Sequence, residues 1–254
     1  MPAAGITFAN VSYTLPSGRA LLRDIQLELE AATTTAILGR SGSGKTTLLR
    51  MVNRLVEPTS GAVRIGDRPA AHYDRTELRR SIGYVIQETG LFPHMTVERN
   101  AGLPLELAGQ SPKQRENRTT KVLALAGLDS AAPDFAEFRA RYPWQLSGGQ
   151  RQRVGLARAL ATDPTVLLMD EPFGALDPLT RAEMQTMLRG LLARVGKTVL
   201  LVTHDLDEAL YLAQRVVFLE AGEVVADLPT AEVLQSQNLH VRTYVNAVHR
   251  AVQP

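Results

Sequence analysis

Two glycine-rich segments of this chain carry residue types that bind anions. Residues 39–47 read Gly-Arg-Ser-Gly-Ser-Gly-Lys-Thr-Thr and match the P-loop pattern G-x-x-x-x-G-K-[ST] in full. In that pattern, backbone N–H groups surround a phosphate, the lysine contacts the terminal phosphates and the hydroxyl residue binds Mg²⁺. Residues 146–150 read Leu-Ser-Gly-Gly-Gln and can form a second anion site at the start of a helix. The first segment indicates a nucleoside triphosphate as ligand, and the second narrows the kind of protein that uses it.

The P-loop pattern has the local context that phosphate binding requires. Residues 33–38 form an apolar, β-branched run that predicts a strand, and apolar residues recur at helical spacing from 48 to 56. Lys45 would then contact the β- and γ-phosphates and Thr46 the Mg²⁺, with the positive end of the helix dipole directed at the same anion. A glycine-rich turn before a core helix is the alternative, and the complete pattern in this order argues against it. The predicted phosphate-site residues are Gly39, Arg40, Ser41, Gly42, Ser43, Gly44, Lys45, Thr46 and Thr47.

Two adjacent carboxylates end another apolar run. Residues 166–171 read Val-Leu-Leu-Met-Asp-Glu. An Asp at the carboxyl end of a parallel strand is where a P-loop protein is expected to hold its metal, so Asp170 is the predicted metal-side carboxylate. Glu171 should face elsewhere and could orient or deprotonate the attacking water, because hydrolysis needs an in-line nucleophile. A lone Asp here would more often be a turn or cap residue, and the pair of carboxylates favours hydrolysis over simple binding.

A histidine follows a further apolar run. Residues 198–203 predict a strand, and His204 and Asp205 come directly after it. A single histidine at a strand end is usually a surface or structural residue. If this strand neighbours the one that ends at Asp170, His204 lies on the nucleotide side and can contact the γ-phosphate or the attacking water.

The second glycine-rich segment also has a structural explanation. Ser147 followed by two glycines is an ordinary start for the helix that the apolar residues between 151 and 161 predict. The same residues offer free N–H groups, a helix dipole and a hydroxyl, which together suit an anion. Both explanations stay open on the residues alone.

Hydrophobic periodicity predicts the elements that position these residues. Residues 6–15 and 25–30 alternate around a turn at 16–18, which predicts antiparallel strands with one solvent-facing side. Between 87 and 161 the pattern is mainly helical, and we expect its four prolines to break it into pieces. These prolines are Pro104, Pro112, Pro133 and Pro143. Further strands are predicted at 63–65, 82–86 and 165–169, a helix at 179–195, a hairpin over 216–225 around Ala221-Gly222, and helix in the last ~30 residues.

Composition limits the class of protein. The 254 residues include 21% charged residues and a net charge of only +2, with Lys and Arg spread along the chain, so a nucleic-acid partner is not indicated. The chain has no cysteine, which excludes disulfides, thiolate zinc sites and cysteine nucleophiles. The first residues lack the pattern of a signal peptide, and no apolar run approaches the ~20 residues that span a bilayer. We therefore expect an intracellular chain that is soluble by itself.

Taken together, these motifs resemble the nucleotide-binding subunit of ABC transporters over almost the entire chain. In that family, Gln87 matches the Q-loop, residues 146–150 the signature, residues 174–178 the D-loop and His204 the switch histidine. The resemblance implies an α/β fold of the P-loop NTPase, RecA-like type. Such a fold has a mostly parallel sheet with flanking helices, an N-terminal antiparallel β subdomain and an inserted helical subdomain.

The resemblance also predicts domain limits. A single ABC ATPase domain would span 1–254, with its nucleotide-binding core and β subdomain in 1–87 and 162–254. The inserted helical subdomain with the signature would span 88–161.

The resemblance adds cofactors and partners that spacing cannot show. It implies ATP and Mg²⁺, with Tyr13 stacked on adenine, although an aromatic residue in an alternating strand is more often core packing. Gln87 would bind Mg²⁺ and couple to a membrane partner, although by itself it is merely a polar strand end. Two copies would pair head to tail, so that the signature of one completes the ATP site of the other. The residues acting in trans would be Ser147, Gly148, Gly149 and Gln150.

The resemblance favours one branch of this family. The chain has no coiled-coil insertion, zinc-binding cysteines, second cassette or fused membrane spans, which favours a separate ATPase subunit of a bacterial importer. Residues 82–109 look most like ATPases for quaternary amines such as glycine betaine, choline or carnitine. Leu91, Phe92, Pro93 and His94 are then candidate permease contacts, or a turn packed on its own lobe. Many such ATPases carry a C-terminal pair of regulatory domains, whereas 34 residues follow Glu220 here.

The expected partners are a second copy of the chain, integral-membrane permease subunits and, indirectly, a solute-binding protein. The chain would lie in the cytoplasm, on the inner face of the cell membrane, through the permease. Three alternatives remain open. They are an importer ATPase for another small solute such as amino acids, a soluble ABC ATPase acting on ribosomes or nucleic acid, and a regulatory protein that binds nucleotide without turnover.

Overall fold

The computed structural model of this chain describes residues 2–248. The chain divides into two compact units. One contains residues 3–75 and 198–248 and is called the P-loop unit; the other contains residues 2 and 76–197 and is called the signature unit. The predicted domain limits at 88 and 161 do not coincide with this division and stay a prediction.

The P-loop unit contains an antiparallel sheet, as the alternating residues predict. Its strand order is β2-β1-β4-β5. The strands are β1 (Ile6–Thr14), β2 (Ala20–Leu29), β4 (Ser60–Ile65) and β5 (Arg68–Pro69), followed by the short helix η1 (Ala70–His72). Ile6 and Phe8 of β1 and Ile25 of β2 are buried, whereas Thr7 between the first two is half-buried and the neighbours of Ile25, Asp24 and Gln26, are exposed. The period of two therefore gives one core face and one solvent face.

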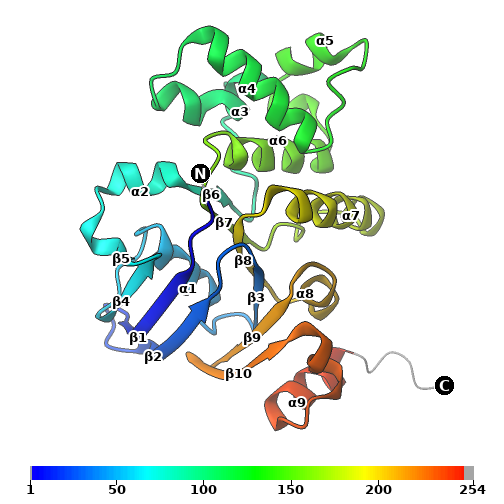
Figure 1. The fold of residues 1–254 in the computed structure, drawn as a ribbon. Helices are drawn as coiled ribbons and strands as arrows, with labels where there is room; N and C mark the ends of the chain where they lie inside the picture. Colours follow the sequence, from blue (N-terminus) through cyan, green and yellow to red (C-terminus); the bar gives the residue numbers. More distant parts are fainter. Residues whose placement is uncertain (1, 249–254) are drawn as a thin grey trace, which may run out of the picture. The chain divides into compact units, whose positions relative to one another are not determined.

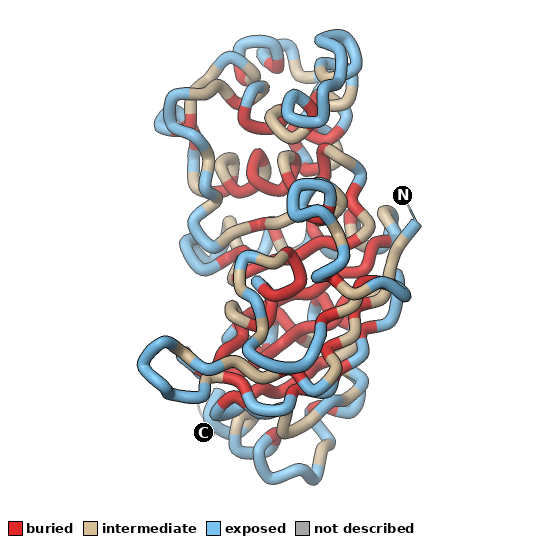
Figure 2. Tube along the Cα trace, turned by 90° about the vertical axis from the view of Figure 1, so that its left-hand side faces the viewer, coloured by how far each residue is buried: buried red, intermediate tan, exposed pale blue. Residues whose placement is uncertain are grey.

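The same unit contains four strands in the order β10-β9-β3-β8 (blue, gold and orange in Figure 1). β3 (Thr34–Leu38) runs parallel to β8 (Thr198–Thr203) and to β9 (Arg215–Glu220), and β10 (Glu223–Pro229) is antiparallel to β9. Every residue of β3 and β8 is buried (red in Figure 2), as expected for strands covered on both faces. Ala221 and Gly222 have φ values of 49° and 84°, which is the geometry of a tight hairpin turn and confirms the predicted hairpin. The helices are α1 (Lys45–Val52), α8 (Leu206–Leu212), η3 (Thr230–Gln235) and α9 (Leu239–Val248).

The signature unit combines a parallel strand pair with a group of helices. β6 (Ile82–Val85) pairs with β7 (Val166–Asp170), and α2 (Arg75–Ser81) leads into β6. α3 (Val97–Leu107), α4 (Pro112–Leu125) and α6 (Gly148–Leu160) contact one another (green in Figure 1). The remaining elements are α5 (Phe135–Ala140), η2 (Pro143–Gln145) and α7 (Pro178–Val195).

The structure corrects two local predictions. Pro104 does not break the helical pattern, because it lies inside α3, which continues to Leu107. A proline inside a helix removes one hydrogen bond, and here the next residue, Leu105, is fully buried against the unit. The helix after the P-loop ends at Val52 rather than continuing to residue 56, since Arg54 has a φ of 54° and Leu55 is 52% exposed. Within residues 2–248, no helix has both the length and the apolar character needed to cross a membrane.

Candidate active site

The P-loop, residues 39–47, connects β3 to α1 and follows a path that only glycine permits. Gly42 and Gly44 have φ values of 79° and 103°, which lie in the left-handed region. A Cβ on Gly39 would lie 2.2 Å from the carbonyl oxygen of Leu219, and one on Gly44 would lie 2.6 Å from Cδ2 of Leu22. The loop therefore runs closely between β9 and β2, and larger residues at these positions would displace it.

Lys45 and Ser43 place polar atoms inside this loop. Lys45 is 5% exposed, and its Nζ donates hydrogen bonds to the carbonyl oxygens of Gly39 at 2.8 Å and Arg40 at 3.0 Å. The Ser43 hydroxyl is buried and has no hydrogen-bond partner among residues 2–248. Because buried polar atoms are almost always satisfied, an orphaned hydroxyl beside a cation and a helix N-terminus suits an anionic ligand that brings its own acceptors. Thr46 and Thr47 follow on the first turn of α1 and are half-buried.

His204 and Tyr13 belong to the same unit as the P-loop. The parallel register pairs Leu38 with Thr203, so His204 leaves β8 next to the point where Gly39 leaves β3. Its side chain is exposed. Tyr13 is half-buried on β1 opposite Leu22, the residue that contacts the Gly44 position. His204 thus directly follows a strand beside β3, and Tyr13 lies opposite a residue that contacts the P-loop.

The predicted carboxylates lie at the end of β7 in the signature unit. Asp170 is buried, and the Tyr84 hydroxyl donates a hydrogen bond to its Oδ2 at 3.3 Å. Glu171 has a φ of 45°, a conformation that non-glycine residues adopt mainly where function or packing imposes it. Gln87 Nε2 donates to Glu171 Oε2 at 3.4 Å. The structure therefore joins Gln87 and Glu171, which the sequence placed in separate motifs.

The signature segment, residues 146–150, forms the N-terminus of α6. The Ser147 hydroxyl accepts a hydrogen bond from the Gln150 N–H at 3.2 Å, and Gln150 Oε1 accepts one from the Ser147 N–H at 3.0 Å. This reciprocal pair is a capping box, so the structural explanation of the serine holds. A Cβ on Gly149 would lie 2.6 Å from Cγ2 of Thr180, which shows how closely α6 and α7 approach. α7 has its own cap, because the Thr180 N–H and side chain donate to Asp177, and these bonds lower the pKa of its carboxyl.

Two residues that the sequence did not single out fix the loop after Gln87. Asn100 is fully buried, accepts a hydrogen bond from the Phe92 N–H at 2.8 Å and donates to the Phe92 and Met95 carbonyls at 3.1 and 2.9 Å. Arg158 of α6 donates to the carbonyls of Thr89 and Gly90, both at 2.7 Å, and burial lowers its pKa. Neither residue belongs to a recognisable pattern. Asn100 bonds the irregular loop just before its own helix, and Arg158 bonds backbone atoms that are distant in the sequence.

The predicted partner contacts in this loop are mostly exposed. Phe92 is 41% exposed, Pro93 and His94 are exposed, and Leu91 is half-buried. The Phe92 and His94 rings meet edge to face with centroids 6.0 Å apart. A buried amide thus holds an exposed aromatic turn at the surface of the signature unit.

The site residues are divided between the two units. The P-loop, Tyr13 and His204 lie in the P-loop unit, whereas Gln87, Asp170, Glu171 and the signature segment lie in the signature unit. Their roles in one reaction stay predictions.

The fold and these motifs define a P-loop NTPase of the ABC type, and comparison with known proteins agrees. Residues 22–174 match the family described as ABC transporter, which is more than half of the chain. The chain belongs to this family.

Individual members of the family are similar to this chain over most of its length. The carnitine transport ATP-binding protein OpuCA of Listeria monocytogenes is 42% identical over 94% of this chain and 59% of its own length. The glycine betaine uptake system ATP-binding protein YehX of Escherichia coli K12 is 46% identical over 87% of this chain and 69% of its own length. The chain thus spans less than two thirds of the carnitine relative. The solved dimeric ABC transporter cassette MJ0796 covers 89% of this chain with 35% identity and a TM-score of 0.77, and the chain covers 98% of it.

Proposed function

We propose that this chain is the ATP-hydrolysing subunit of a bacterial ABC importer that takes up quaternary-amine osmoprotectants. The observation that carries the ATP site is the buried Lys45 ammonium beside the orphaned Ser43 hydroxyl at the start of α1. The choice of solute rests on relatives such as OpuCA and YehX, whose names describe carnitine and glycine betaine transport.

In this proposal the P-loop binds the phosphates of ATP. Lys45 exchanges its bonds to the Gly39 and Arg40 carbonyls for phosphate oxygens, and the Ser43 hydroxyl gains the acceptor that it lacks. The left-handed glycines allow backbone N–H groups to curl round an anion, and the dipole of α1 favours the negative charge. The remaining loop positions, Ser41, Gly42, Thr46 and Thr47, border the same phosphates, and Tyr13 stacks on adenine.

Hydrolysis would depend on residues of both units acting on one nucleotide. Thr46, Asp170 and Gln87 provide oxygen ligands of the kind that Mg²⁺ prefers, and the ion would neutralise charge on the β- and γ-phosphates. Glu171 orients or deprotonates the attacking water, and its hydrogen bond from Gln87 holds the carboxylate in place. His204 contacts the γ-phosphate or this water.

The signature segment would act on ATP held by a second copy of the chain. The first N–H groups of a helix have no intrahelical acceptor, and the capping box satisfies those of Ser147 and Gln150. Gly148 and Gly149 therefore offer N–H groups and the positive end of the α6 dipole to an anion. The dimeric state of the MJ0796 cassette supports this arrangement.

A permease would dock on the signature unit and hold the chain at the inner face of the membrane. Phe92, Pro93 and His94 form an exposed turn, and a groove of 430 Å³ lies on the same unit. Leu107, on the groove wall, is 62% exposed, and Arg79 and Arg80 add positive charge. Arg158 lines this groove and also holds the Gly90 carbonyl, so one side chain links both surfaces. An amphipathic helix with acidic residues fits this surface, and a solute-binding protein would act only through the permease.

The test combines ATP hydrolysis with uptake. Purified chain is assayed for Mg²⁺-dependent ATP hydrolysis, and cells lacking osmoprotectant uptake receive the chain with the permease encoded beside it and labelled glycine betaine. We expect hydrolysis and uptake from the unaltered chain. Glu171→Gln should still bind ATP but lose hydrolysis by about 100-fold or more and accumulate as a dimer.

Two results would contradict parts of this proposal. If Glu171→Gln hydrolyses ATP at the normal rate and stays a monomer with ATP, the assignment of Glu171 as the base and the trans role of the signature segment are both wrong. Uptake of another solute but no quaternary amine would leave the ATPase and change the transported class.

A further inference from the structure

Helix α9, in the P-loop unit, reaches the backbone of His204. The hydroxyl of Tyr244 donates a hydrogen bond to the His204 carbonyl oxygen at 2.6 Å. The Tyr244 ring also meets Phe218 of β9 edge to face, with centroids 5.7 Å apart and an interplanar angle of 78°. One tyrosine thus connects α9 to β9 and to the residue that follows β8.

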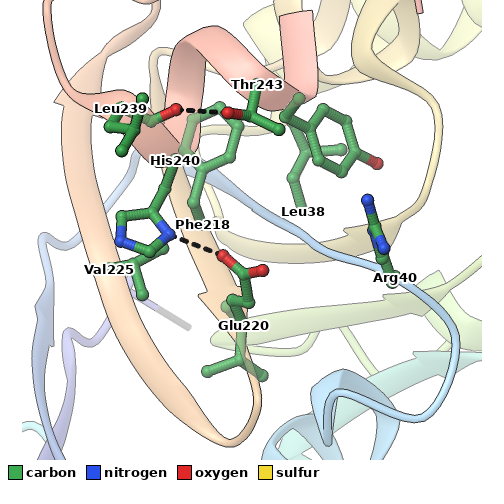
Figure 3. A pocket seen from close by; sticks show the side chains of 10 residues that line it. Leu38, Arg40, Phe218, Glu220, Val225, Leu239, His240 and Thr243 are labelled. Carbon is green, nitrogen blue, oxygen red and sulfur yellow. Dashed lines mark hydrogen bonds and ion pairs between the residues drawn. The ribbon is translucent and has the colours of Figure 1, made fainter. Parts of the chain in front are cut away.

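The strand under Tyr244 is the strand that borders the P-loop. Phe218 pairs with Leu38 in the parallel register, and the next carbonyl, of Leu219, lies where a Cβ on Gly39 would clash. A pocket of 180 Å³ lies here, and Figure 3 shows Arg40 of the P-loop, Phe218, Glu220 and His240 around it. Tyr244 also lines this pocket. α9 therefore lies near the start of the P-loop, across this pocket, and bonds the backbone of His204.

The helix does not depend on Tyr244 for its attachment. At its N-terminal end, His240 Nδ1 lies 2.7 Å from Glu220 Oε2 of β9, and Asn238 Nδ2 donates to the Val225 carbonyl at 3.1 Å. Val241, a residue of the first turn of α9, is fully buried. Loss of a single hydroxyl three residues further on should leave α9 in place, which separates the role of this hydroxyl from the role of the helix.

The His204 carbonyl that Tyr244 bonds belongs to the 204–205 peptide, which is part of the backbone that carries the His204 side chain. On its C-terminal side the chain is already fixed, because the Asp205 N–H donates to the Thr203 hydroxyl at 3.0 Å and Asp205 caps α8 by accepting from the Glu208 N–H at 3.1 Å. The bond from Tyr244 fixes the peptide group between His204 and Asp205 from the other side. With this peptide plane fixed, the backbone at His204 is restricted, and so is the direction in which the Cα–Cβ bond of the exposed imidazole leaves it.

We propose that Tyr244 is a positioning residue for His204 and that α9 supports the catalytic geometry of the proposed ATP site. The inference rests on the proposed ATPase function. Because catalysis requires reacting groups to be held within a fraction of an ångström, a small rotation of the 204–205 peptide would slow hydrolysis while leaving phosphate binding by the P-loop intact.

The test removes one hydroxyl and compares it with its neighbour. Tyr244→Phe should lower kcat for ATP hydrolysis about tenfold, with KM for ATP and the melting temperature close to those of the unaltered chain. Thr243→Val is the matched control, because it removes the adjacent hydroxyl of α9, which lines the same pocket but bonds to the Leu239 carbonyl within the helix (Figure 3). We expect its kcat to stay unchanged.

A double-mutant cycle distinguishes positioning from a structural role. If Tyr244 acts through the imidazole, Tyr244→Phe should have no further effect on kcat in a His204→Ala background. Equal fractional losses in both backgrounds, or a loss in melting temperature without a change in kcat, would overturn the inference. An unaltered chain that hydrolyses ATP together with a fully active Tyr244→Phe would also overturn it, whereas absence of hydrolysis by the unaltered chain would instead contradict the proposed function.

Discussion

The P-loop and the signature segment are both glycine-rich turns at the start of a helix, but they satisfy their polar groups differently. In the P-loop, the Ser43 hydroxyl is buried without a hydrogen-bond partner among the described residues, and Lys45 lies on the loop's own carbonyls. In the signature segment, Ser147 and Gln150 satisfy each other in a capping box. The P-loop therefore has a side-chain hydroxyl that can still bond an anion, whereas the side chains of Ser147 and Gln150 in the signature segment already bond the helix N-terminus.

Charge extends this difference. The P-loop contains two cations, Arg40 and Lys45, whereas residues 146–150 contain none. Arg151, the next residue, donates from Nη1 to the Leu146 carbonyl at 2.7 Å and so uses its guanidinium within the turn. What the signature segment can offer is N–H groups and a helix dipole, which contribute less than a buried ammonium. Such a site suits a phosphate that another group already holds, as the trans arrangement requires.

The largest expected effect comes from removing the P-loop cation. Lys45→Ala should weaken ATP binding by about 100-fold or more, because charge-assisted hydrogen bonds to phosphate are lost from a buried position. A fluorescent ATP analogue titrated against the purified chain measures this. Lys121→Ala, which removes an exposed lysine of α4, serves as the control for charge alone. Unchanged ATP affinity in Lys45→Ala would refute the phosphate role of Lys45, and the P-loop would then no longer differ from the signature segment as a charged anion site.

A second, smaller effect should follow from the orphaned hydroxyl. Ser43→Ala should lower ATP affinity about tenfold while leaving the melting temperature of the nucleotide-free chain equal or higher, because a buried group without a partner destabilises the folded state. Titration and thermal melts of the same sample give both values. A lower melting temperature with unchanged affinity would mean that Ser43 is structural, which would remove the contrast with Ser147.

Ser147→Ala should show the opposite pattern. Loss of this cap should cost the nucleotide-free chain ~1 kcal/mol of stability and leave ATP affinity of a single copy unchanged, while hydrolysis falls several-fold. Ser111→Ala is the control, since Ser111 is the N-cap residue of α4 in the same unit and bonds the Gln114 side chain through its N–H at 3.1 Å and its hydroxyl at 2.8 Å, but lies in no predicted site. Equal hydrolysis in the two variants would leave the signature segment as a helix start only.

The fluorescence of the sole tryptophan of the chain can report on the effect of Ser147→Ala. Trp144 lies two residues before the signature segment, stacks on Tyr142 with centroids 4.6 Å apart and is 66% exposed. If a second copy covers this region, ATP should change its fluorescence in Glu171→Gln and not in the double variant with Ser147→Ala.

Prediction from sequence succeeded where a local pattern has one physical solution. The alternation of residues 6–15 could bury only one face, and Ala221-Gly222 suited only a tight turn. It failed at Pro104, because the burial of Leu105 outweighs the local cost of a proline, and at the end of α1, where propensity would have allowed another turn. Contacts such as Arg158 with Thr89 or Tyr244 with His204 join residues far apart in sequence and leave no local pattern to find.

The sequence by itself determined the family, most of the strands and the identity of the two glycine-rich segments, because each depends on short-range spacing and on the chemistry of a few side chains. It did not predict α2 or α8. Only the tertiary structure decided which of their polar groups are already satisfied. Ser43 and Ser147 read alike as serines beside glycines, yet one hydroxyl is buried without a partner among residues 2–248 and the other closes a capping box. The reason is physical: hydrogen-bond satisfaction depends on what surrounds an atom in space, and the neighbours of an atom in the sequence supply only part of those surroundings.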